Sequence, residues 1–214
     1  MSPRQCVSGS SSVGIDWPAG SRAMRSFFGK VRVRFVDDLP DRDLTDTIID
    51  AIDETTGVIA VSSVQYATGT LVDVRRLARS AQTVGALLIV DATQAAGAML
   101  VDTSTLEADA VVTSGYKWLG GHGGVALAAV SESLLKQLPI LPGWMGALDP
   151  FDFDAKSVSF ASDARRFTQS TMSYVSIAGL TVSIEQLLSL GEVQIEEHAR
   201  QLAAMLVDGA RESG

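Results

Sequence analysis

Two near-continuous apolar runs, each leading into a polar residue, constrain the fold of this chain most strongly. The run over 87–90 ends at Asp91, and the run over 110–112 leads into Lys117. Because these runs lack the alternation of a strand with one wet face, they indicate strands covered on both faces and a mainly parallel sheet. Ligands bind such sheets at the carboxyl ends of the strands, so we expect Asp91 and Lys117 to lie together at that edge.

The rest of the chain alternates short apolar runs with amphipathic stretches, as βαβ units do. Strands are expected over 31–36, 58–61, 86–90, 110–113 and 125–130, with a weaker candidate over 13–16. Helices are expected over 41–53, from Val74 to Gly85, over 131–138, and from Tyr174 to about Ala210 with a break at Gly191. Residues 139–165 show no clean period. The pattern predicts an α/β fold: a mainly parallel sheet with helices on both faces.

Composition narrows the classes of function. The 214 residues are 46% hydrophobic and 20% charged, which is typical of a globular chain with a sizeable core. A net charge of -8 and a pI of about 4.7 argue against a nucleic-acid partner. Cys6 is the single cysteine, so an intrachain disulfide is excluded and a reducing compartment is expected. No apolar run approaches the roughly 20 residues of a membrane span. We expect no signal peptide, because the one charge near the start is not followed by an apolar stretch. We therefore expect a cytoplasmic protein without a membrane partner.

An amine and a carboxylate at one sheet edge suit pyridoxal 5'-phosphate, because Lys117 could form a Schiff base and Asp91 could keep the pyridine nitrogen protonated. Opposite unit charges about 4 Å apart attract by roughly 4 kcal/mol at an effective dielectric near 20. This attraction is enough to raise the pKa of the pyridine nitrogen by about two units. Packing of Lys117 between Tyr116 and Trp118 would partly desolvate the amine and favour its reactive form. Considered separately, Asp91 would be interpreted as a turn residue and Lys117 as a surface lysine. Only the joint pattern favours the cofactor site.

Four segments carry a family resemblance: 61–70, 90–97, 113–119 and, more weakly, 166–171. The first three occur in the order and spacing of the class V aminotransferase family, which this chain resembles. These are fold type I pyridoxal phosphate enzymes that include cysteine desulfurases, kynureninases and isopenicillin N epimerase-like proteins. The fourth segment has Thr168 where the family usually has Glu, and Ser170 where it usually has Gly.

The resemblance implies roles for individual residues. Lys117 would be the Schiff-base lysine and Asp91 the partner of the pyridinium nitrogen in an enzyme whose small-molecule substrate is an amino acid. Thr171 resembles the residue that reaches the phosphate of the neighbouring subunit, which implies a homodimer with shared sites. The other implied cofactor contacts are Gln94 at the ring oxygen, Gln65 where the family often has Asn, and Ser114 and Tyr116 at the phosphate.

The resemblance covers only the middle of a family member, so we expect a truncated or fragmentary gene product. Residues 1–12 would be loose, 13–190 a partial large domain, and 191–214 a helix leading to an absent small domain. A phosphate-cradling loop, a ring-stacking aromatic residue and an arginine for the substrate carboxylate are not identifiable. Cys6 does not match the catalytic cysteine of a desulfurase.

Three hypotheses follow. The first is a pyridoxal-dependent enzyme or its core, in which transamination, racemisation, elimination and desulfuration remain open. The second is a catalytically inactive family member that acts at most as a binding module. The third is an unrelated nucleotide-binding α/β protein, although no phosphate-binding glycine fingerprint follows a strand.

Overall fold

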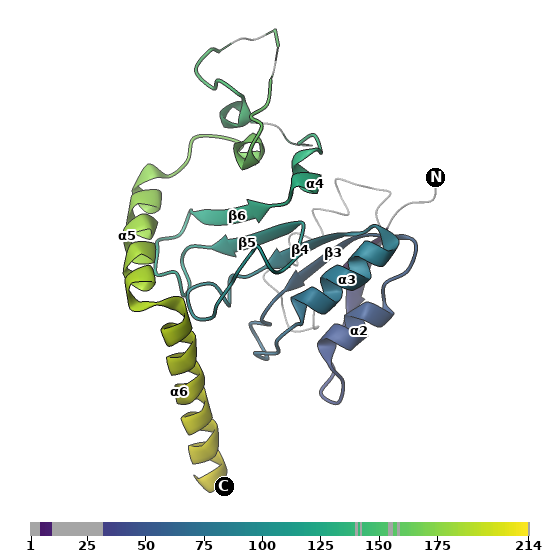
Figure 1. Cartoon of the computed structure of the whole chain (residues 1–214), viewed down its shortest axis with the longest axis vertical. Coiled ribbons are helices and arrows are strands. Elements are labelled where there is room, and N and C mark those ends of the chain that lie inside the picture. The colour runs from purple at the N-terminus through teal and green to yellow at the C-terminus, as the bar shows by residue number, and fades with distance from the viewer. Residues whose placement is uncertain are drawn as a thin grey trace.

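The protein is described from a computed structural model, which covers residues 5–9, 32–139, 141, 143–153, 156–157 and 159–213. The strand expected over 13–16 lies outside these residues. The described strands form one six-stranded sheet in the order β2-β1-β3-β4-β5-β6 (Figure 1). Strands β1 to β5 are mutually parallel, and β6 runs antiparallel to β5.

Five strands lie where the apolar runs predict them. They are β2 (Arg32–Val36), β3 (Thr56–Ser62), β4 (Leu87–Asp91), β5 (Ala110–Ser114) and β6 (Ala126–Val130). Their ends differ from the expected ones by one or two residues, which is the usual uncertainty of strand boundaries. The mainly parallel α/β sheet is therefore confirmed.

Residues 1–12 were expected to be loose, but part of this segment is a strand. Gln5–Gly9 form β1, which pairs in parallel with β2 on one side and β3 on the other. This segment has no long apolar run, and its pairing partners lie far along the chain. Backbone hydrogen bonding to two distant strands, rather than local propensity, makes it a strand.

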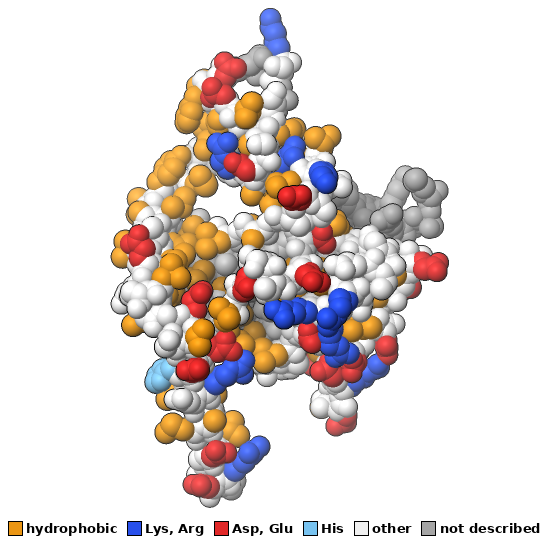
Figure 2. Space-filling view, in the orientation of Figure 1, with side chains coloured by type: hydrophobic (Ala, Val, Ile, Leu, Met, Phe, Trp, Pro, Cys, Tyr) orange, Lys and Arg blue, Asp and Glu red, His pale blue; other side chains and the backbone are white. Residues whose placement is uncertain are grey.

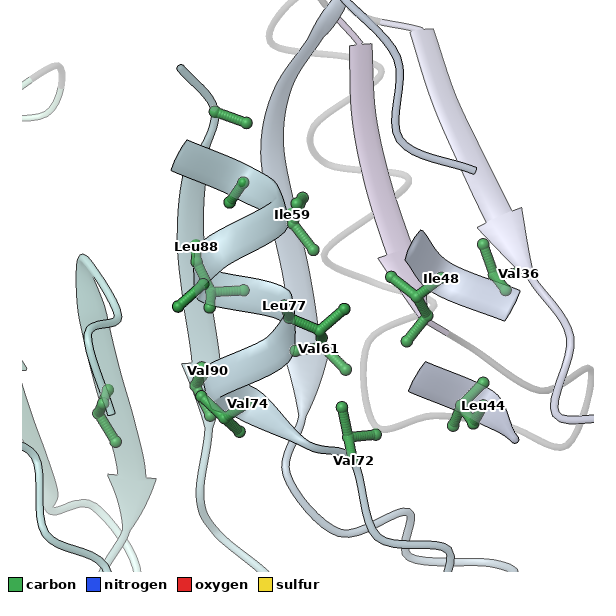
Figure 3. Close-up of a cluster of buried hydrophobic side chains, with 14 of the residues drawn as sticks. Val36, Leu44, Ile48, Ile59, Val61, Val72, Val74, Leu77, Leu88 and Val90 are labelled. Carbon is green, nitrogen blue, oxygen red and sulfur yellow. The ribbon is translucent and has the colours of Figure 1, made fainter. Parts of the chain in front are cut away.

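The core lies between the sheet and two helices on one of its faces, α2 (Leu44–Asp50) and α3 (Val74–Val84) (Figure 3). Helix α2 is shorter than the predicted 41–53 because the Asp43 side chain accepts a hydrogen bond from the Asp46 amide and caps the first turn. Helix α3 ends at Gly85, as expected. The core side chains are Val36, Leu44, Ile48, Ile59, Val61, Val72, Val74, Leu77, Ala78, Ala81, Ala86, Leu88, Val90, Ala92 and Val111.

Strand β4 shows how the sheet divides its side chains. Leu88 and Val90 are buried under α3, whereas Leu87, Ile89 and Asp91 are half-buried. Successive strand side chains point to opposite faces. Asp91 therefore belongs to the face away from α3.

The second half of the chain is more open. It contains α4 (Glu132–Leu135), the short turns η1 (Trp144–Gly146) and η2 (Ala164–Phe167), and helices α5 (Tyr174–Leu190) and α6 (Glu192–Ser213). Apolar side chains are exposed along α5 and α6 (Figure 2). Among the described residues no single helix is long and apolar enough to cross a membrane; α5 and α6 meet the length and composition criteria only as a pair, bent by 79°.

Candidate functional site

The carboxyl ends of β3, β4 and β5 meet at one edge of the sheet, because the three strands are parallel and adjacent. Asp91 is the last residue of β4 and pairs with Ser62 of β3 and Val112 of β5. Lys117 lies in the turn that follows β5. The structure thus places Asp91 and Lys117 at the same edge, at the end of β4 and in the turn after its neighbour β5.

Hydrogen bonds tie the segments at this edge to one another. The Ser63 amide donates to the carbonyl of Asp91 at 2.9 Å, which joins the loop after β3 to β4. The Ser114 amide donates to Thr93 Oγ1 at 3.0 Å, which joins the end of β5 to the turn after β4. Sequence reasoning missed Thr93, although this residue lies inside the matched segment 90–97. Its hydroxyl fixes the turn after Asp91 relative to the strand that leads to Lys117.

The Asp91 carboxylate is held by one of its two oxygens. Asp91 Oδ1 accepts a hydrogen bond from the Thr93 amide at 2.8 Å. Within the described part of the chain, Oδ2 accepts none. A half-buried carboxylate with one oxygen free of protein donors can attract a cationic group such as a protonated ring nitrogen.

The surroundings of Lys117 agree in part with the sequence-based expectation. Lys117 is half-buried, and its Nζ lies 5.7 Å from the centroid of the Tyr116 ring. Tyr116 and Trp118 are themselves 51% and 58% exposed, so much of each aromatic residue faces solvent.

The remaining predicted site residues are distributed as follows. Gln65 is almost fully buried in the loop after β3, and its Nε2 donates to the carbonyl of Ser62 at 3.3 Å. Gln94 is half-buried in the turn after β4, and Ser114 ends β5. The structure brings these three to the edge that carries Asp91 and Lys117. Thr171 lies apart from them along the chain, exposed in the connection between η2 and α5.

The residues present fit a pyridoxal 5'-phosphate ligand by the chemistry of their donors. Residues that carry a primary amine, a carboxylate, amide side chains and hydroxyls lie at one edge of the sheet. These are the groups that can attach the aldehyde, pair with the ring nitrogen and bind oxygens of the ligand. Among the described residues, no cluster of His, Cys, Asp and Glu could hold a metal ion.

Comparison with known proteins identifies the family and the fold. The family model described as aminotransferase class-V matches residues 23–214. A kynureninase of Deinococcus radiodurans is 32% identical over 167 residues, covering 77% of this chain and 39% of that relative. A probable cysteine desulfurase of Methanothermobacter thermautotrophicus is 31% identical over 160 residues, covering 74% and 39%.

Solved structures with the same fold include the apo cysteine desulfurase of Thermococcus onnurineus NA1. Its TM-score is 0.81 at 23% identity, and the match covers 98% of this chain and 51% of that one. The cystine C–S lyase C-DES, solved with its product cysteine persulfide, has a TM-score of 0.78 at 21% identity and matches 91% of this chain and 51% of its own. A C-DES mutant has been solved with glycine covalently linked to the PLP cofactor. These likenesses confirm the fold type I architecture.

The match also bounds what the chain contains. This chain spans about two fifths of the length of these curated relatives and about half of these solved structures. The expectation that only part of a family member is present is therefore confirmed. The hypothesis of an unrelated nucleotide-binding protein is wrong, because the family model matches most of the chain. From its sheet, its ordered motifs and this match, the chain belongs to the aminotransferase class-V family.

Proposed function

We propose that this chain is the core of a pyridoxal 5'-phosphate-dependent enzyme that acts on an amino acid through Lys117. The observation that carries the proposal is the position of Asp91 and Lys117 at one edge, with Asp91 at the end of β4 and Lys117 in the turn after the adjacent parallel strand β5. Membership of the class V family supports it. A related fold with glycine linked to PLP supports the choice of cofactor and of an amino acid as substrate.

When bound, the cofactor supplies an electron sink that stabilises negative charge at the substrate carbon. The chain's own groups attach and orient it. In this proposal the Lys117 amine would hold the cofactor covalently, and the Asp91 carboxylate would pair with its ring nitrogen. Gln94 and Gln65 would contact the cofactor, and Ser114 and Tyr116 would bind its phosphate, which completes the roles that the resemblance implies.

The Asp91 side chain is suited to its role because its geometry is fixed before any ligand arrives. The Thr93 amide holds Oδ1, and Thr93 is in turn held by the Ser114 amide. A carboxylate fixed in this way loses little conformational freedom when it pairs with a cation. The reaction that follows is open among transamination, epimerisation, elimination and desulfuration, since relatives named kynureninase and cysteine desulfurase share this fold and family.

Covalent trapping tests the proposal. Protein mixed with pyridoxal phosphate and reduced with borohydride should carry the label on Lys117, as read by peptide mass. Lys117→Ala should carry no label, whereas Lys136→Ala, which removes an exposed lysine on the surface, should label like the wild type. Asp91→Asn should still be labelled but should turn over amino acids at least about 100-fold more slowly, because a neutral amide cannot hold the ring nitrogen protonated. Absence of label on wild-type Lys117 would contradict the proposal.

We also propose a homodimer with shared sites. The exposed position of Thr171, in the connection between η2 and α5, suits a residue that serves a neighbouring subunit. Sedimentation velocity should show a dimer. Mixing Thr171→Ala with Lys117→Ala should restore one site in each mixed dimer, because the first variant supplies Lys117 to that site and the second supplies Thr171. A strictly monomeric wild type would contradict this part.

A second candidate is a binding module without catalysis. It is favoured by the short span of the chain relative to the curated relatives. Any amino acid turnover that disappears in Lys117→Ala would eliminate it.

A further inference from the structure

Helix α5 packs directly against the turn that carries Lys117. The Ser183 hydroxyl donates a hydrogen bond to the carbonyl of Leu119 at 2.7 Å, between residues 64 positions apart in the sequence. Leu119 and Leu180 are only 8% and 3% exposed, so the contact between turn and helix excludes water. A buried carbonyl needs a hydrogen-bond donor, and Ser183 supplies it.

The turn approaches α5 so closely that it needs glycine at the contact. Gly120 has a φ of +70°, and a Cβ at this position would lie 2.5 Å from Ser183 Oγ. At Gly121 a Cβ would lie 2.9 Å from Leu180 Cδ1. The glycines thus allow the backbone of the turn to lie against the serine hydroxyl and the leucine side chain.

Hydrogen bonds within the turn fix the shape of the turn but do not fix its position relative to α5. The Gly120 amide donates to the carbonyl of Lys117 at 3.0 Å, and the Gly121 amide donates to the carbonyl of Gly115 at 2.8 Å. The bond from Ser183 differs from these, because it ties the turn to a separate helix of 17 residues.

We propose that Ser183 is a positioning residue for Lys117: by holding the carbonyl of Leu119 it fixes the turn, and so the amine, relative to Asp91 at the sheet edge. The inference deepens the proposed function and rests on the role given there to Lys117. Ser183 touches neither of the proposed reacting groups. It acts through the backbone of the turn.

Amide hydrogen exchange in the cofactor-free protein measures the hold on the turn directly. In Ser183→Ala, exchange of the Gly120 and Gly121 amides should accelerate by about two- to tenfold, the effect of one lost hydrogen bond. Exchange at Leu77 in α3 should not change. Ser189→Ala is the matched control, because Ser189 lies on the same helix but donates to the carbonyl of Gln186 in its own helix.

The second measurement is the rate at which borohydride-fixed pyridoxal phosphate accumulates on Lys117. Ser183→Ala should slow this rate by a similar factor, and Ser183→Thr, which keeps the hydroxyl, should restore both readouts. Unchanged exchange at Gly120 and Gly121 in Ser183→Ala would overturn the inference, as would faster exchange with an unchanged labelling rate.

Failure of the proposed function is distinguishable from failure of this inference. If the wild type takes no label while Ser183→Ala still loosens the turn, the cofactor assignment fails and the hold of Ser183 on the turn stands. If Ser183→Ala also exposes the Leu77 amide, the fold itself is lost. Ser183→Cys, which keeps the size and a weak donor, then replaces it with the same expected and contradicting results.

Discussion

At the scale of single residues, the closest backbone approach at the candidate site lies between Gly97 and Trp118. Gly97 has a φ of +95°, and a Cβ there would lie 2.6 Å from both the carbonyl carbon and the carbonyl oxygen of Trp118. The neighbour is backbone, which cannot rotate away as a side chain can. The turn after β4 and the turn with Lys117 are therefore in direct contact, with room for no side chain between them.

Gly97→Ala should consequently destabilise the protein by about 2–4 kcal/mol, combining backbone strain with a steric clash. Urea unfolding at pH 7 measures the change in the free energy of unfolding. Gly69→Ala is the matched control, because Gly69 has a φ of +73° but no atom within 4 Å of the added Cβ. It should cost only about 1 kcal/mol. Equal losses for the two variants would show that the contact with Trp118 is not tight.

The sequence predicts some of these residues and not others. Asp91 and Lys117 are found because each ends or follows an apolar run, so a local pattern marks them. Ser183 has no such mark, since its partner Leu119 lies 64 positions away and one serine on a helix resembles any other. The exposure of Tyr116 and Trp118 was not foreseen either, because it depends on the path of the turn and not on residue type.

At the scale of elements, helix α3 is where sequence and structure agree best. The spacing of Val74, Leu77, Ala78 and Ala81 predicts a single apolar face, and all four side chains are buried. Figure 3 shows Val74 and Leu77 facing the core side chains of β3 and β4. Strands β2 to β6 are also predicted from local sequence, since their apolar runs identify them without knowledge of the strands they pair with. Strand β1 was missed because only its pairing with β2 and β3 makes it a strand.

Leu77→Ala should destabilise the protein by about 2–5 kcal/mol, because Leu77 is fully buried and its loss leaves a cavity under α3. Thermal or urea unfolding gives the value. Leu206→Ala on α6 removes the same atoms from a side chain that is 75% exposed, and should change stability by less than about 0.5 kcal/mol. A large effect of Leu206→Ala would mean that α6 is covered in solution.

At the scale of the whole molecule, Glu196 connects the C-terminal helix to the sheet edge. Glu196 Oε2 accepts a hydrogen bond from the Leu100 amide at 2.8 Å, and Oε1 accepts one from Arg200 Nε at 2.8 Å. The Leu100 amide first, and Arg200 second, hold the pKa of Glu196 below its usual value of 4.5. Because α5 and α6 are consecutive, one helical pair thus contacts both turns that flank the candidate site.

Since the pKa of Glu196 is lowered on folding, its carboxylate stabilises the protein above the unfolded-state pKa, and this stabilisation is lost as pH falls through the folded-state pKa. Glu196→Gln should therefore be less stable than the wild type at pH 7, by about 1 kcal/mol or less at this partly exposed position. The difference should shrink as pH falls below about 4.5. Urea unfolding across this range measures it, with Glu185→Gln on α5 as an exposed control. A difference that grows on acidification would contradict the assignment.

Strand β6 has a consequence for handling the protein in solution. It stands last in the sheet, its residues Ala126–Val130 carry no charge, and within the described part of the chain nothing pairs with its outer side. An uncharged edge strand with unpaired backbone groups can act as a template on which the strands of further chains add. Light scattering by the purified chain should accordingly rise with concentration, and a lysine in place of Ala128 should suppress the rise while leaving the α3 core untouched.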